Sequence, residues 1–188
     1  MAPKFKITKE QIMDTALELI SESGDSCLTP RRLAEALGCS TQPLYSNFAS
    51  FEELMQAVLD GAYERYFDFI KKEVESGKYP EYKAFGMAYI RFAKDEPALF
   101  RLLFMRDNGG KAPTPAADYT ASVEMIMQAN GISRESAELM HLEMWSCVHG
   151  IATMLATSFF APEWELVSRM LSDVYQGVRS LQVLEGKV

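Results

Sequence analysis

The chain has 188 residues, of which 48% are hydrophobic, and carries a formal net charge of −7. This length and apolar content predict a globular protein with a substantial core and exclude an intrinsically disordered chain. No apolar run approaches the roughly 20 residues of a membrane span, and the N-terminus lacks the apolar core of a secretory signal. The three cysteines are odd in number and scattered, so a disulfide framework is not expected. We therefore expect a cytoplasmic protein without a membrane partner.

The first quarter of the chain predicts two short helices that are separated by a tight turn. Thr29 is placed to cap a helix, and Pro30 occupies the first position, where a missing N–H costs nothing. Gly38 is placed to end that helix in a left-handed conformation, and Ser40 to cap the next one. Two short helices that meet at a glycine-containing turn form the geometry that places the second helix in a DNA major groove.

Hydrophobic periodicity and capping signals predict an all-α chain of about nine helices without a strand. The first helix is expected to open with a capping box, Thr8 with Gln11, and the fourth with another, Ser50 with Glu53. The fourth helix is long enough to connect the two halves without a flexible linker. The domain boundary is therefore expected inside this helix, near Leu54. The expected helices cover residues 9–23, 30–37, 41–48, 50–76, 81–94, 97–106, 117–129, 134–158 and 162–184.

The residues around the glycine turn resemble the DNA-binding domain of TetR-family transcriptional regulators, over about residues 7 to 60. Two positions depart from that pattern, because Asn47 stands where histidine is usual and Phe51 where a phosphate-contacting lysine is usual. The matching positions are Leu28, Thr29, Arg31, Leu33, Ala34, Leu37, Gly38, Cys39, Ser40, Leu44, Tyr45, Phe48, Glu52 and Leu54.

A second stretch, Trp145 followed by His149 and Gly150, resembles the Trp…His-Gly motif of one C-terminal subgroup of the same family. Together the two resemblances imply an all-helical, homodimeric, ligand-responsive repressor. Residues 1–54 would form its helix-turn-helix DNA-binding domain, and residues 55–188 its ligand-binding and dimerisation domain.

The second helix of the motif exposes polar side chains once Leu44 and Phe48 turn inward. Gln42 and Asn47 carry the paired donor and acceptor that match adenine, and the helix has no Arg or Lys, so an A·T-leaning readout is expected. The acidic net charge argues against a nucleic-acid partner, but the basic residues gather in the N-terminal arm and at the start of the preceding helix. The predicted DNA-binding residues are Lys4, Lys6, Thr29, Arg31, Thr41, Gln42, Pro43, Tyr45, Ser46 and Asn47.

The helix expected over residues 134–158 is apolar almost all round, which predicts burial on more than one side. The family resemblance implies that it pairs with the last helix across a two-fold axis, and a purely intramolecular core is the alternative. The expected dimer residues are Val148, Ala152, Leu155, Met170, Val174, Gly177, Val178 and Leu181.

Aromatic and methionine side chains of the expected ligand-binding domain, residues 55–188, are candidates for a pocket that binds a small apolar effector, and an ordinary core is the alternative. The predicted ligand-binding residues are Phe67, Tyr89, Phe92, Phe100, Phe104, Met125, Trp145 and His149.

No catalytic residue, cofactor or metal site is predicted. His141 and His149 lie eight residues apart near Glu138 and Cys147, but neither i, i+4 histidines nor a CxxC motif is present. A small helical enzyme with either histidine as a general base remains an alternative, although no nucleophile or phosphate loop supports it. A helical interaction module that has lost DNA binding is the other. The favoured hypothesis is a dimeric repressor that binds a pseudo-palindromic operator and is released by a small apolar ligand.

Overall fold

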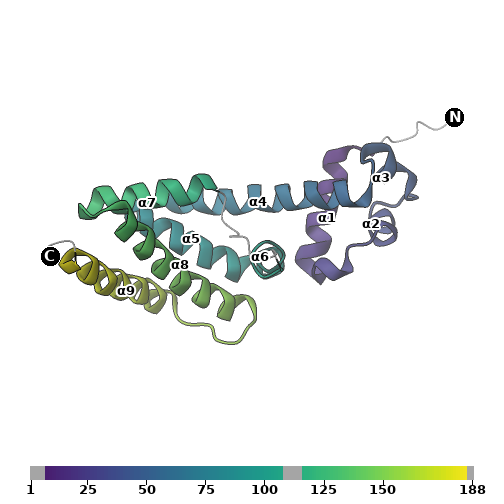
Figure 1. Cartoon of the computed structure of the whole chain (residues 1–188). Helices are drawn as coiled ribbons and strands as arrows, with labels where there is room; N and C mark the ends of the chain where they lie inside the picture. The colour runs from purple at the N-terminus through teal and green to yellow at the C-terminus, as the bar shows by residue number, and fades with distance from the viewer. Residues whose placement is uncertain (1–6, 108–115, 186–188) are drawn as a thin grey trace. The chain divides into compact units, whose positions relative to one another are not determined.

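The computed structural model describes residues 7–107 and 116–185, and this part of the chain is entirely helical (Figure 1). The all-α prediction is confirmed, with nine α-helices, one 3-10 turn and no strand over the described ranges. The elements are α1 (Lys9–Ser23), η1 (Asp25–Cys27), α2 (Pro30–Ala36), α3 (Gln42–Asn47), α4 (Phe51–Glu75), α5 (Glu81–Asp95), α6 (Pro97–Phe104), α7 (Ala116–Asn130), α8 (Arg134–Ala156) and α9 (Trp164–Glu185).

Three predicted N-caps are present at helix starts in the first half of the chain. The hydroxyls of Thr8, Thr29 and Ser50 each accept a hydrogen bond from the backbone amide three residues on, at 3.2, 3.3 and 3.2 Å. The capping box at Thr8 is reciprocal. At the start of α4, however, the Glu53 carboxylate accepts from the amide of Ala49 at 2.7 Å, one residue earlier than a standard capping box would place it.

The prediction that Ser40 caps α3 is wrong. The helix begins at Gln42, and Thr41 stands at the cap position without a side-chain hydrogen bond. Thr41 has α-region angles (φ −71°, ψ −12°), whereas a capping side chain reaches the first amides from an extended backbone. The 3-10 turn η1 was not predicted, and α9 begins at Trp164, two residues later than expected.

The chain divides into two compact units: Met1–Phe67 with Glu96–Arg106, and Asp68–Asp95 with Asp107–Val188. It therefore passes from one unit to the other three times along its length, and α4 contributes residues to both. These units describe packing, whereas the predicted boundary near residue 54 separates functions, so that boundary stays a prediction.

The first unit is held by contacts of α1 with α2, η1 and α6. The Glu96 carboxylate, just before α6, accepts a hydrogen bond from the Ser21 hydroxyl at 3.1 Å and lies 3.6 Å from the Arg65 guanidinium. One side chain thus joins α1, α4 and the start of α6. The largest fully buried side chains of this unit are Ile12, Ile20, Leu33, Leu44, Leu54, Leu99, Phe100 and Leu103.

In the second unit, α8 packs against α5, α7 and α9. Gly86 of α5 permits a close approach to both α8 and α9. A Cβ at this position would lie 3.2 Å from Val148 Cγ2 and 3.4 Å from Leu171 Cδ1. Phe69 packs edge-on against the fully buried Phe92, with 5.3 Å between ring centroids, and joins the end of α4 to α5.

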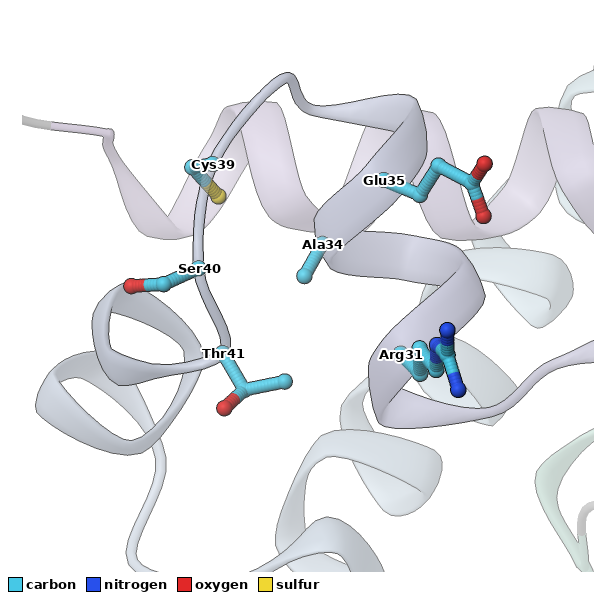
Figure 2. A pocket seen from close by; sticks show the side chains of 6 residues that line it. All are labelled: Arg31, Ala34, Glu35, Cys39, Ser40 and Thr41. Atoms are coloured by element: carbon cyan, nitrogen blue, oxygen red, sulfur yellow. The ribbon is translucent and has the colours of Figure 1, made fainter.

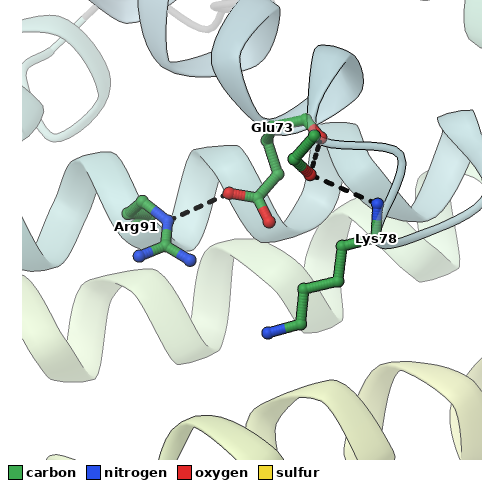
Figure 3. A network of polar contacts seen from close by, with 4 residues as sticks. Glu73, Lys78 and Arg91 are labelled. Carbon is green, nitrogen blue, oxygen red and sulfur yellow. Dashed lines mark hydrogen bonds and ion pairs between the residues drawn. The ribbon is translucent and has the colours of Figure 1, made fainter.

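A charged contact inside the second unit joins the end of α4 to α5 (Figure 3). The Arg91 Nε donates to Oε2 of Glu73 at 3.0 Å, and the Glu73 side chain is only 8% exposed. The Arg91 guanidinium also lies over the Trp164 ring, 4.5 Å from its centroid, so it contacts the first residue of α9 as well. Ser76 closes the same helix end, because its hydroxyl donates to the Glu73 carbonyl and accepts from the Lys78 amide.

Candidate nucleic-acid interface and the body residues

The turn between α2 and α3 is compact and hydrogen-bonded. Gly38 has a left-handed backbone (φ +65°), as the sequence predicts, and its amide donates to the Glu35 carbonyl at 3.0 Å. The Cys39 amide donates to the Ala34 carbonyl at 2.9 Å. These bonds satisfy the last carbonyls of α2 and direct the chain into α3. The geometry is that of a helix-turn-helix motif.

The short helix α3 has one buried and one exposed face. Leu44 is 1% exposed and Phe48, just after the helix, 2% exposed. Tyr45 is 52% exposed. Of the other predicted DNA-binding residues, Thr29, Arg31, Thr41, Gln42 and Ser46 are exposed and Pro43 is half-buried. Lys4 and Lys6 lie outside the described residues.

An open hollow of about 370 Å³ lies between α2 and the turn that precedes α3 (Figure 2). Arg31 supplies a cation and Glu35 a carboxylate, so the hollow is not purely basic. The lining residues are Arg31, Ala34 and Glu35 from α2, and Cys39, Ser40 and Thr41 from the turn.

Asn47 differs from the other polar residues of α3, because its side chain is half-buried and hydrogen-bonded. Its Nδ2 donates to the Pro43 carbonyl at 2.8 Å and to the Ile7 carbonyl at 3.3 Å. Sequence reasoning did not anticipate the second bond, since residues 7 and 47 are distant in the chain. Phe51, at the position where a lysine is usual, is the half-buried first residue of α4.

In the second unit, three of the predicted ligand-binding residues lie together between α5 and α8. A hydrogen bond of 2.9 Å joins the Tyr89 hydroxyl and His149 Nδ1. The Trp145 ring stacks on the His149 ring with 4.9 Å between centroids and 11° between planes. Burial lowers the pKa of His149, which favours the neutral imidazole.

A second tyrosine–histidine pair joins the same two helices. The Tyr82 hydroxyl and His141 Nδ1 are 3.0 Å apart, and the Tyr119 ring meets the His141 ring edge-on at 5.3 Å. Burial lowers the pKa of His141, and burial followed by the nearby Tyr175 raises the pKa of Tyr82. Sequence reasoning missed this pair. The available signal was the spacing of about two helical turns between the tyrosines of α5 and between the histidines of α8.

Of the other predicted ligand-binding residues, Phe92 and Met125 also belong to the second unit. Phe92 packs on Phe69 with no exposed surface, and Met125 is half-buried on α7. Phe67, Phe100 and Phe104 belong to the first unit. There Phe100 and Phe104 are in contact, with ring centroids 5.3 Å apart. A role in ligand binding stays a prediction for all eight residues.

The predicted dimer residues differ in exposure. Val148 and Ala152 are buried within the chain itself, and Leu155, Met170, Val174 and Val178 are half-buried. Gly177 and Leu181 are exposed, Leu181 by 58%. Other apolar side chains of this region that were not among the predicted dimer residues are exposed, namely Leu139 and Leu142 on α8, Leu166 on α9, and Phe159 and Phe160 between the helices.

Among the described residues, no group of three or more His, Cys, Asp or Glu side chains could hold a metal ion. His141 and His149 instead belong to the two separate tyrosine pairs. No described helix combines the length and apolar character required to cross a bilayer.

Comparison with known proteins agrees with this geometry. Residues 82–174 match the family described as the C-terminal domain of tetracyclin repressor-like proteins. An uncharacterized HTH-type transcriptional regulator of Mycobacterium tuberculosis is 27% identical over 166 residues, which cover 84% of this chain and 74% of that protein. The chain is similar to TetR-like transcriptional regulators.

Two further relatives bear on the TetR-like fold. The class D tetracycline repressor of Escherichia coli is 27% identical over 105 residues, which cover 56% of this chain and 43% of the repressor. A TetR variant from Acinetobacter baumannii AYE, solved in complex with minocycline, superposes with a TM-score of 0.61 at 20% identity. That alignment covers 94% of this chain and 99% of the variant, and it supports the fold.

Proposed function

We propose that this chain is a TetR-like repressor that acts in the cytoplasm, binds a pseudo-palindromic DNA operator as a dimer, and leaves it when a small apolar ligand binds. One observation carries the proposal. In the helix-turn-helix unit, the apolar residues of α3 are buried while Gln42 and Tyr45 point outward. An exposed polar face on the second helix of such a motif is what major-groove recognition requires.

Within this proposal, Gln42 reads adenine through its paired amide donor and acceptor. Arg31, Thr29 and Tyr45 contact phosphates, which fix register without selecting sequence. Because the Thr29 hydroxyl already caps α2, we rank Thr29 below Arg31 and Tyr45 as a phosphate contact. Because Asn47 uses both amide protons inside the fold, we remove it from the set of base-reading residues.

The charge of the chain sets how strongly salt should weaken binding. Residues 1–50 carry five basic and six acidic side chains, so the attraction to DNA is local to the arm and to α2. From about 4–6 phosphate contacts in each half-site, we expect a modest salt dependence, because each contact releases about one counterion.

The two-fold symmetric dimer is proposed to form through α8 and α9. Two leucines on α8, Leu139 and Leu142, and two on α9, Leu166 and Leu181, are at least 45% exposed, and an accumulation of exposed apolar side chains marks a protein–protein interaction site. Since Val148 faces α5, the outer face of α8 that carries Leu139 and Leu142 replaces it in the proposed interface.

The ligand is proposed to contact the group formed by Tyr89, Trp145 and His149. Stacked aromatic rings with one polar edge suit a flat, mostly apolar molecule. Release of DNA requires that the ligand bind two conformations unequally, and a coupling of about 1–3 kcal/mol is typical. Helix α4 contributes residues to both units, and we propose that it transmits the conformational change caused by the ligand.

The test is an in vitro selection of random double-stranded DNA by the purified full chain at two salt concentrations. The proposal predicts enrichment of a two-fold symmetric, A·T-leaning motif whose binding weakens with salt. Enrichment without two-fold symmetry would refute binding as a dimer. A chain that enriches no DNA at low salt would favour the helical interaction module instead.

A variant test asks whether α3 reads sequence. Gln42→Ala should weaken binding to the selected operator by about 1–3 kcal/mol and relax the preference at the contacted base pair. Gln56→Ala is the matched control, because Gln56 is an exposed glutamine on α4 that bonds only to Asp60 among the described residues. Equal affinity and unchanged base preference for Gln42→Ala would remove Gln42 from the set of base-reading residues.

A further inference from the structure

We propose that Asn47 is a positioning residue that fixes the start of α1 against the end of α3, the proposed recognition helix. In this way Asn47 sets where the basic N-terminal arm meets DNA. This inference rests on the proposed DNA-binding function. It assigns to Asn47 a task other than the contact with a base that the sequence suggests.

The geometry of the Asn47 amide supports this assignment. An asparagine Nδ2 group has two protons, and here both are directed at backbone carbonyls. One bond, to Pro43 at 2.8 Å, stays within α3, and the other, to Ile7 at 3.3 Å, joins two segments forty residues apart. Reading adenine would need one of these protons as a donor to N7, so Asn47 would have to break at least one of the two bonds to serve as a reader.

The neighbouring residues hold the same junction. The Lys9 ammonium lies 4.7 Å from the centroid of the Phe48 ring, which is itself almost fully buried. Between Ile7 and Lys9, Thr8 is fixed by its reciprocal capping box. Ile7, Thr8 and Lys9 are therefore each held in place at the start of α1. Asn47 holds Ile7, and Phe48 holds Lys9.

Two lysines precede this junction in the sequence. Lys6 directly precedes the anchored Ile7, and Lys4 lies three residues before it. Holding the attachment point next to α3 raises the effective concentration of the two cations at the phosphates beside the recognition helix.

The experiment is a double-mutant cycle on operator affinity, which combines Asn47→Ala with the pair Lys4→Ala and Lys6→Ala. In the chain with both lysines, Asn47→Ala should weaken binding about three- to tenfold, within the range of coupling between groups that act together. Without the lysines, the same change should have less than about a twofold effect. Alanine is preferred to aspartate, because a new negative charge would weaken DNA binding by itself.

The matched control is Ser46→Ala. Ser46 is the preceding residue, is exposed, and its hydroxyl donates only within α3, to the Gln42 carbonyl at 3.0 Å. Its replacement should have the same effect with and without the arm lysines. The salt slope gives a second readout, because Asn47→Ala should reduce its magnitude by about 0.9 for each phosphate that the arm no longer neutralises.

A measurement without DNA separates the anchor from the proposed function. Trypsin cleavage after Lys9, followed by mass spectrometry, should be faster in Asn47→Ala and unchanged in Ser46→Ala. Unchanged cleavage in Asn47→Ala would overturn the anchor. Equal affinity losses with and without the lysines, together with an altered base preference, would show that Asn47 reads a base and would overturn the inference. Faster cleavage in a chain that enriches no DNA would refute the DNA-binding function while leaving the contact itself intact.

Discussion

Replacing Arg91 by methionine should destabilise the chain strongly, because it leaves the Glu73 carboxylate buried without its partner. Removal of one member of a buried ion pair typically costs about 3–5 kcal/mol. The lower end applies here, since the Arg91 side chain is 38% exposed while that of Glu73 is 8% exposed. Loss of the packing against the Trp164 ring adds about 0.5–1 kcal/mol. We therefore expect a loss of about 3–4 kcal/mol in the free energy of unfolding.

The assay is urea unfolding at one fixed chain concentration, with the free energy extrapolated to zero denaturant. The double variant Glu73→Met with Arg91→Met removes both charges and should be more stable than Arg91→Met alone. Arg169→Met is the control, because Arg169 pairs with Asp173 on an exposed face and should change stability by less than about 1 kcal/mol. A loss below about 1 kcal/mol for Arg91→Met, or a double variant less stable than the single one, would refute the reasoning.

Three further predictions concern the turn, the histidines and the dimer. Gly38→Ala should cost about 1–2 kcal/mol from backbone strain alone, because the position has a φ of +65° and open space around it. An unchanged melting temperature would contradict this. Because burial lowers the pKa of His141 and of His149, the unfolded chain binds protons more readily, so stability should be complete above about pH 6.5 and fall as the pH drops below it. Urea midpoints between pH 8 and 5 measure the effect, and His141→Gln combined with His149→Gln should flatten the curve. Leu142→Glu should shift the chain from dimer to monomer in sedimentation velocity, because it places a charge on the exposed apolar face of α8. A dimer that persists would remove this face from the interface.

Local signals predicted most of the helix framework because they act over three or four residues. Thr8, Thr29 and Ser50 each cap the helix expected of them, and Gly38 has the left-handed backbone that ends α2. Ser40 failed as a cap because the backbone angles of the next residue place the helix start elsewhere, and composition does not reveal those angles.

The candidate site was harder to predict because it depends on which faces meet. Helix α8 is apolar on several sides, and periodicity alone does not tell a face covered by α5, such as that of Val148, from an outward one, such as that of Leu142. Asn47 looked like a reader of bases because its partner, Ile7, lies far away in the sequence. The Tyr82–His141 pair is likewise a contact between distant residues.

The three passages of the chain between its packing units bear on how such a regulator can be re-engineered or recombined. Helix α6 follows α5 in the chain but is packed with α1, and its residues Leu99 and Leu103 are almost fully buried. A chimera joined at a single breakpoint in α4 would therefore take its helix-turn-helix segment from one parent and α6, which packs on α1, from the other. To exchange the first unit and keep both sides of its core from the same parent, two segments must be transplanted together, residues 1–67 and 96–106. The same requirement would disfavour natural recombination at that single point.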